Sequence, residues 1–207
     1  MVKRRLIYTM VIASLLTGCS ANSDTITNFE NNNTAIEDNI EEETTVYTVF
    51  NALGKSYESS KNIYELNEGD KIYDDMNGYP HVEGEYKEVD FAIDLLTEYL
   101  HKNSEAYNYI VSEWDSNSEE VILISGEEKE KVKENADFLG EQFGLSSEEP
   151  VYFKLDKVIL QSKNEDNSIV ELELRGYLSA TDGNYRPLGT FTVTVYTKDD
   201  KLYGAIV

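Results

Sequence analysis

The spacing of apolar residues changes once along this chain, near Pro150. Before that proline, the residues from Val89 onward repeat at the spacing of a helix, while Asp90, Asp94 and Glu98 fall on the opposite side. Residues three and four apart share one face of a helix, so this segment is predicted to be an amphipathic helix that covers a core. The apolar side of the predicted helix is formed by Val89, Ala92, Ile93, Leu96, Tyr99 and Leu100.

Two further helices are predicted before Pro150. Ser104 can cap a short helix with one apolar stripe, made of Tyr107, Ile110, Val111 and Trp114. Ser125 and Glu128 have the spacing of a capping box, and Gly144 suits a left-handed C-cap, so a longer helix is predicted between them. Its stripe is Val132, Ala136, Leu139 and Phe143. The run Val121–Ile124 fits either a short buried strand or the lead-in to the longer helix.

After Pro150 the apolar residues recur at every second position. Three alternating runs are separated by turn-forming segments at 164–167 and 181–184, and a third such segment, 198–201, joins the last run to residues 202–207. Consecutive strands with short turns predict an antiparallel meander with one buried face, which carries Val170, Leu172, Leu174, Phe191, Val193 and Val195. Helices followed by such a sheet place the domain in the α+β class.

Residues 46–207 are long enough for one domain of this kind. Within them, residues 46–88 carry short apolar patches split by turn-like clusters, and fit an edge hairpin or an irregular flap equally well. Residues 20–45 are rich in Asn, Ser, Thr, Asp and Glu and hold too few apolar residues to form a core. We expect this segment to be a disordered, acidic tether.

The N-terminus combines basic residues 3–5 with a short apolar run, Leu6–Leu16, and small residues before the single cysteine, Cys19. It resembles a bacterial lipoprotein signal peptide with the lipobox Leu16-Thr17-Gly18-Cys19. The resemblance implies removal of residues 1–18, acylation of Cys19 and residence on the extracytoplasmic face of the cell membrane. An uncleaved anchor and a plain secreted protein are the alternatives.

Composition restricts the partners of such a chain. Removing the three basic side chains of residues 1–18 takes the formal net charge from −22 to −25. A chain this acidic is repelled by nucleic acid and by anionic lipid headgroups, so only the lipid on Cys19 is expected to hold it at a membrane. With its one cysteine acylated, the domain has no internal disulfide.

The order of the predicted elements over residues 87–207 resembles the cystatin-like or nuclear-transport-factor-like superfold. That resemblance implies helices packed on the concave face of a curved sheet, with room for a pocket. Many domains of this kind bind ligands or partners and some are enzymes. Because no family motif is matched, no catalytic residue is carried over.

Motifs of known chemistry are scarce in the sequence. The two histidines, His81 and His101, lack zinc-site spacing, and the run Asp74–Gly78 fails as a calcium loop, so no metal is expected. No serine-nucleophile motif and no glycine-rich phosphate loop occurs, and no cofactor is expected. With 40 Asp and Glu residues, a catalytic carboxylate pair cannot be recognised without geometry.

The 15 tyrosines leave recognition as the best-supported class of function. Tyr107 and Trp114 lie on a predicted apolar stripe and are expected in the core, whereas Tyr177 and Tyr196 fall on the polar face of their strands. We expect these two tyrosines to lie close together on adjacent strands, with Glu171 and Glu173 favouring a partner with basic groups. The predicted function is a lipid-anchored module that binds an envelope protein or glycan without catalysis. Alternatives are a carboxylate-dependent enzyme acting on envelope material and an immunity or conjugation accessory lipoprotein.

Overall fold

The computed structural model describes residues 50–66, 83–146, 149–179 and 184–207, and the side chains from Ala52 on. These residues belong to one compact unit, Glu42–Val207. The signal sequence with Cys19, the tether at 20–45, His81 and the turn at 181–183 lie outside the described residues. So do residues 46–49 and 67–82 of the uncertain segment 46–88, which include the run 74–78.

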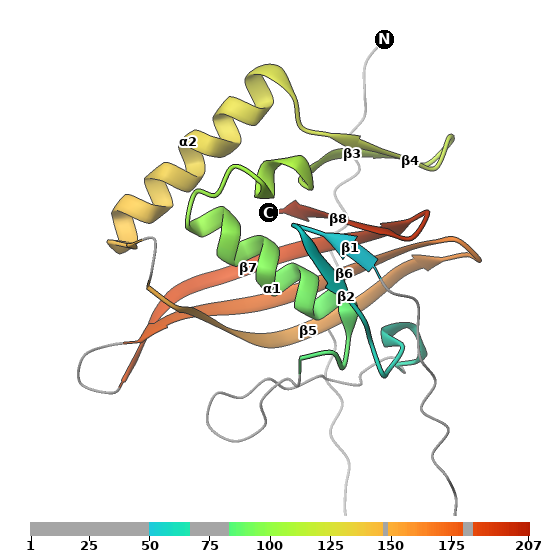
Figure 1. The fold of residues 1–207 in the computed structure, drawn as a ribbon, viewed down its shortest axis with the longest axis horizontal. Coiled ribbons are helices and arrows are strands. Elements are labelled where there is room, and N and C mark those ends of the chain that lie inside the picture. The colour runs from blue at the N-terminus through green and yellow to red at the C-terminus, as the bar shows by residue number, and fades with distance from the viewer. Residues whose placement is uncertain (1–49, 67–82, 147–148, 180–183) are drawn as a thin grey trace, which may run out of the picture. The chain divides into compact units, whose positions relative to one another are not determined.

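Four long strands form the centre of the α+β fold (Figure 1). They are β5 (Val151–Lys163), β6 (Asn167–Ser179), β7 (Tyr185–Lys198) and β8 (Lys201–Ile206), paired antiparallel in chain order. The predicted change of period at Pro150 is confirmed, because β5 begins at the next residue. The turn between β7 and β8 consists of Asp199 and Asp200, both with positive φ (49° and 57°), as a tight hairpin turn requires.

One face of this sheet, the inner face, is closed by α1 (Lys87–Leu100) (Figure 1). The six residues predicted to face inward are each at most 8% exposed. Glu171 and Glu173, between them on β6, are half-buried on the outer face. Leu95 and Phe91 of α1 pack so closely on β8 that a Cβ at Gly204 would clash with Leu95. The predicted helical stripe is confirmed except for Ile93, which is half-buried, and it omitted Phe91 and Leu95, which are fully buried.

The second helix, α2 (Gly126–Phe143), covers the fold much less than α1 does. Only Ala136 and Gly140 are buried in it, and Phe138 is 62% exposed. Gly144 ends it in the left-handed conformation (φ 66°), as predicted. The predicted capping box is wrong: Ser125 makes no side-chain cap bond, and the Glu128 carboxylate accepts from Ser112 Oγ at 2.8 Å instead.

The predicted helix after Ser104 is also wrong. The chain forms a short 3-10 helix, η2 (Ala106–Asn108), and then the strand β3 (Val111–Asp115), which pairs with β4 (Glu120–Leu123). Backbone bonds explain the outcome: Gly204 N–H donates to the Tyr109 carbonyl at 2.9 Å, so this segment extends along β8. The strand option for Val121–Ile124 is right, but only Ile124 is buried.

The described part of the uncertain region 46–88 contains a small hairpin. Its strands are β1 (Phe50–Ala52) and β2 (Lys55–Tyr57), joined by Leu53 and Gly54 with positive φ (49° and 70°). A 3-10 helix, η1 (Ile63–Glu65), follows, begun by Asn62, whose side chain accepts from the Tyr64 backbone N–H. This helix places Tyr64 at the end of the sheet where the β5–β6 and β7–β8 turns meet.

Candidate functional site

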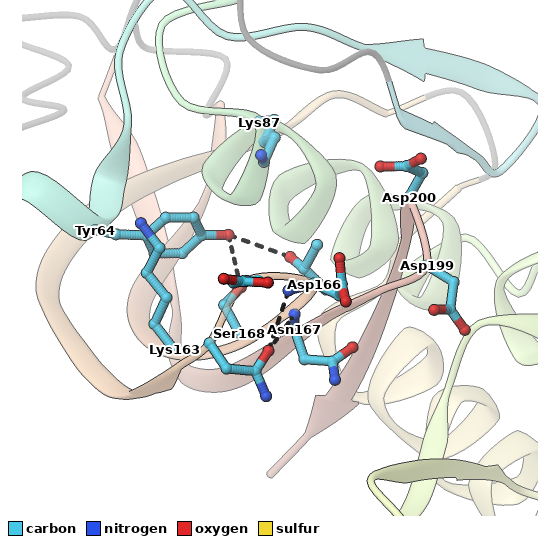
Figure 2. A pocket seen from close by; sticks show the side chains of 11 residues that line it. Tyr64, Lys87, Lys163, Asp166, Asn167, Ser168, Asp199 and Asp200 are labelled. Carbon is cyan, nitrogen blue, oxygen red and sulfur yellow. Dashed lines mark hydrogen bonds between the residues drawn. The ribbon is translucent and has the colours of Figure 1, made fainter.

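A polar hollow of about 480 Å³ lies at this end of the sheet (Figure 2). Its walls come from η1, the first turn of α1, the β5–β6 turn and the β7–β8 turn. We call it the Tyr64 hollow. It is lined by Tyr64, Lys87, Lys163, Asn164, Glu165, Asp166, Asn167, Ser168, Thr197, Asp199 and Asp200.

Tyr64 is held in this hollow by two hydroxyl groups from the sheet. Ser168 Oγ donates to the Tyr64 hydroxyl at 2.6 Å, and Thr197 Oγ1 lies 3.3 Å from the same oxygen. Ser168 and Thr197 are directly opposite each other on β6 and β7, so the sheet register brings both hydroxyls to one point. Burial, and next the negative charge of Glu88, raise the pKa of Tyr64. The tyrosine therefore stays neutral at physiological pH.

Two lysines lie over the Tyr64 ring. Lys163 Nζ is 4.7 Å and Lys87 Nζ is 5.7 Å from the ring centroid, within the range of cation–π attraction. Lys87 is only 8% exposed, although it is the first residue of α1. Burial lowers the pKa of Lys87, the charge of Glu88 raises it, the nearby charge of Lys163 lowers it, and the charge of Asp200 raises it. Two cationic groups thus converge on one side of the hollow.

Behind Lys87 lies a carboxylate that is almost completely buried. Glu88 is 1% exposed, and its Oε1 is 3.8 Å from Lys87 Nζ, an ion pair longer than a hydrogen bond. Within the described residues neither oxygen of Glu88 has a hydrogen-bond partner of good geometry. Burial raises the pKa of this carboxyl, whereas Lys87 and Tyr64 lower it. Since desolvation of a buried pair often exceeds its attraction, stability is a poor explanation for this arrangement.

Carboxylates occupy the opposite side of the Tyr64 hollow. Figure 2 shows Asp199 and Asp200 across the hollow from Tyr64 and Lys163, with Asp166 between them. The tight β7–β8 turn fixes the backbone of both aspartates, and both are exposed. The hollow therefore presents charges of both signs.

A second hollow, of about 590 Å³, lies between the β1–β2 hairpin and α1. Its polar groups bond to one another: Tyr57 donates to Asp94 Oδ2 at 2.8 Å, Lys55 pairs with Asp94 at 2.9 Å, and Asp90 accepts from Gly84 N–H at 2.8 Å. Burial and the bond to Asp94 raise the pKa of Tyr57. These contacts attach the hairpin to α1, and a structural role accounts for them.

On the outer face of the sheet, Tyr177 belongs to a group of three tyrosines. Tyr152 lies directly opposite it on β5, and the ring centroids of Tyr177 and Tyr185 are 6.5 Å apart. Tyr185 also packs edge to face on Tyr152, with ring centroids 5.4 Å apart. We call Tyr152, Tyr177 and Tyr185 the tyrosine cluster. Tyr152 and Tyr185 are 37% and 41% exposed, so the cluster is open to a partner.

Tyr196 lies elsewhere on the same face, and the expectation that it neighbours Tyr177 is wrong. The register places Tyr177 opposite Pro187 but Tyr196 opposite Ile169, toward the other end of β6. Tyr196 instead stacks on Trp114 of β3, with centroids 5.7 Å apart. The sequence did not reveal that β3 would lie there as a strand.

Glu171 and Glu173 lie between the two aromatic groups, opposite Thr194 and Thr192. Glu171 accepts a hydrogen bond from Gln161 Nε2 at 2.8 Å. The charge beside Tyr177 is instead that of Arg175, whose guanidinium pairs with Asp156 at 2.6 Å. Arg175 is therefore the charged residue that the structure shows in contact with Tyr177.

Tyr107 is buried as expected, whereas Trp114, also expected in the core, is half-buried in its stack on Tyr196. His101 ends α1, and its Nε2 lies 2.9 Å from the Glu149 carbonyl. In the described part of the chain, no three His, Cys, Asp or Glu side chains are grouped as metal ligands. Nor does any helix there have the length and apolar character needed to span a membrane.

Several residues of these sites were missed from the sequence. Glu88 stands four residues before Ala92 and seven before Leu95, so its helical phase carried a signal that it would be buried. Tyr152 precedes the inward Phe153 in a period-two run, which also marks it as outward-facing. Tyr64 and Lys163 carried no such signal, because they lie in segments that are far apart in the chain and meet only in the folded structure.

Comparisons with known proteins add little. Neither the family models nor the curated proteins give a match to this chain. Among solved structures, the chain is similar to one described as a calcium/calmodulin dependent protein kinase II association domain from Xanthomonas campestris. The two share 11% identity with a TM-score of 0.33, and the alignment covers 69% of this chain and 97% of the other. A likeness at this level carries no argument about function.

Proposed function

We propose that this chain is a lipid-anchored module that binds a glycan of the bacterial cell envelope. In this proposal Cys19 carries the lipid, the segment up to residue 45 is a tether, and the α+β domain is of the cystatin-like or nuclear-transport-factor-like kind. The observation that carries the binding function is the tyrosine cluster on the outer face of the sheet.

The cluster has the chemistry that a sugar requires. A tyrosine ring offers an apolar face to the C–H groups of a sugar, and its hydroxyl offers a hydrogen bond to the sugar hydroxyls. Tyrosine also loses little conformational entropy on binding. Because the three rings are mounted on long paired strands, they are positioned before the ligand arrives.

The binding test uses the full chain in detergent micelles, incubated with insoluble peptidoglycan and then sedimented. We expect wild type to sediment with the polymer and the triple variant Tyr152→Ala/Tyr177→Ala/Tyr185→Ala to stay in solution. The matched control is Tyr203→Ala, on the same outer face at β8, which should bind like wild type. Equal sedimentation of the triple variant and the control would refute the proposed surface, and turnover of the polymer would refute the non-enzymatic function.

The anchor is tested separately from binding. Cys19→Ala should appear in the medium or as an unprocessed precursor, because the acyl chains would be absent. A processed variant that stays in the membrane fraction like wild type would overturn the lipid anchor.

A further inference from the structure

We propose that the Tyr64 hollow is a second binding site, for a small zwitterion such as an amino acid or a short unblocked peptide. The ligand carboxylate would lie between Lys87 and Lys163, and the ligand ammonium would face Asp199 and Asp200. This site is separate from the tyrosine cluster and does not depend on the glycan-binding proposal.

The cationic side of the hollow is arranged before any ligand is present. Two ammonium groups are directed to the face of one tyrosine, 4.7 and 5.7 Å from its centroid, although like charges repel. The sheet holds that tyrosine through Ser168 and Thr197. A carboxylate placed between the lysines would offset their repulsion through charge-assisted hydrogen bonds.

The burial of Glu88 next to Lys87 is a second observation. Glu88 is 1% exposed, and its contact with Lys87 is 3.8 Å long. Buried ion pairs of poor geometry add little stability, and a buried charged group with a charge partner beside a hollow is a candidate for a functional site. Glu88 holds the Lys87 ammonium from behind, on the side of the core.

The charge balance selects a zwitterion over a simple ion. The chain has a formal net charge of −22, so a simple anion is repelled before it reaches the lysines. A simple cation that enters the hollow is repelled by the two lysines beside Tyr64. A ligand with both charges pairs with both sides, and a hollow of about 480 Å³ is within the size range of small-molecule sites.

The experiment measures binding of three related probes to the full chain in micelles by isothermal titration and by backbone amide shifts. The probes are the dipeptide Ala-Ala, its N-acetylated form without the ammonium, and its C-amidated form without the carboxylate. We expect Ala-Ala to bind about tenfold more tightly than either blocked form, because each block removes one charged contact. Equal affinity for all three probes, or binding by none, would overturn the proposal.

Variants then assign each charge to its side of the hollow. Lys163→Gln should weaken Ala-Ala about tenfold and remove the preference over the amidated form, while Asp200→Asn should remove the preference over the acetylated form. Both positions are exposed, and Asn tolerates the positive φ of residue 200, so folding is preserved. Lys157→Gln, an exposed lysine on the same strand as Lys163, is the matched control and should bind like wild type.

Equal weakening by Lys157→Gln would show a general charge effect and would contradict the site. The tyrosine-cluster triple variant should keep its affinity for Ala-Ala. The peptidoglycan experiment and the Ala-Ala experiment therefore test the two proposals separately. Failure of one proposal does not imply failure of the other.

Discussion

The two faces of the four-stranded sheet are made by the same strands, yet they differ in burial and in the kinds of side chain that they carry. On the inner face, alternate residues such as Leu172 and Val193 are fully buried under α1. On the outer face, their neighbours Glu173 and Thr192 are half-buried, and the aromatic residues stand in two separate groups. Because the period of a strand is two, alternate residues of each strand form the buried inner face, and the residues between them form the outer face.

The largest effect is expected from a truncation on the inner face. Leu172→Ala should lower the free energy of unfolding by about 2–5 kcal/mol, because it leaves a cavity in a packed core. Thr192→Ala, on the outer face of the neighbouring strand, should change it by less than about 0.5 kcal/mol. Urea unfolding followed by circular dichroism measures both, and similar losses in the two variants would contradict the assignment of faces.

A substitution that adds volume to the inner face should have the next largest effect. Gly204→Ala should destabilise by about 1–3 kcal/mol, because its new methyl group meets Leu95 and comes within 3.4 Å of Phe91. Pairing it with Leu95→Ala should recover part of the loss, since the space that the methyl group needs is then vacant. Simple addition of the two single losses would argue against the close contact of α1 with β8.

The inner face was predictable from the sequence, while the arrangement of the outer face was not. Alternation alone assigned Val170, Leu172 and Leu174 to one side, because a strand has no other way to bury them together. The distance between Tyr177 and Tyr196 depends on which residues pair across β6 and β7. That register is determined by the turns and bulges of the folded sheet, not by the alternation.

The failed helix after Ser104 has a similar cause. Tyr107, Ile110 and Trp114 have helical spacing, but the backbone at Tyr109 and Ile110 is paired with Gly204 of β8. A tertiary contact outweighed a weak local preference. The Tyr64 hollow could not be predicted for the same reason, since it is formed by η1, α1 and two turns, and its residues lie up to 136 positions apart, from Tyr64 to Asp200.

A smaller effect should show that the two aromatic groups of the outer face are independent. A double-mutant cycle of Trp114→Ala and Tyr196→Ala should give a coupling of about 0.5–1.5 kcal/mol, as expected for stacked rings. The cycle of Tyr177→Ala and Tyr196→Ala should give almost none, because the register separates these residues. Strong coupling in the second cycle would restore the cross-strand pair that the structure excludes.

The last effect is a change in how the free energy of unfolding depends on pH. At any one pH it should be the smallest of these effects. Burial raises the pKa of Glu88, Lys87 and Tyr64 lower it, and Asp90 raises it slightly. A carboxyl with a raised native pKa binds more protons folded than unfolded, so the free energy of unfolding falls as the pH rises above its ordinary pKa of 4.5. Glu88→Gln removes that loss.

The stability of Glu88→Gln relative to wild type should therefore increase as the pH rises from about 4 to 7. Lys87 acts in the other direction, because its lowered pKa makes the native state gain stability as the pH rises toward 10.5. The Lys87 effect therefore falls in the alkaline range, separate from the range used for Glu88. Urea unfolding at several pH values measures the difference, with Glu171→Gln on the outer face as the matched control. If the control reproduces the same trend, the pH dependence belongs to the acidic surface as a whole, and the contrast between a buried inner carboxylate and the open outer face is lost.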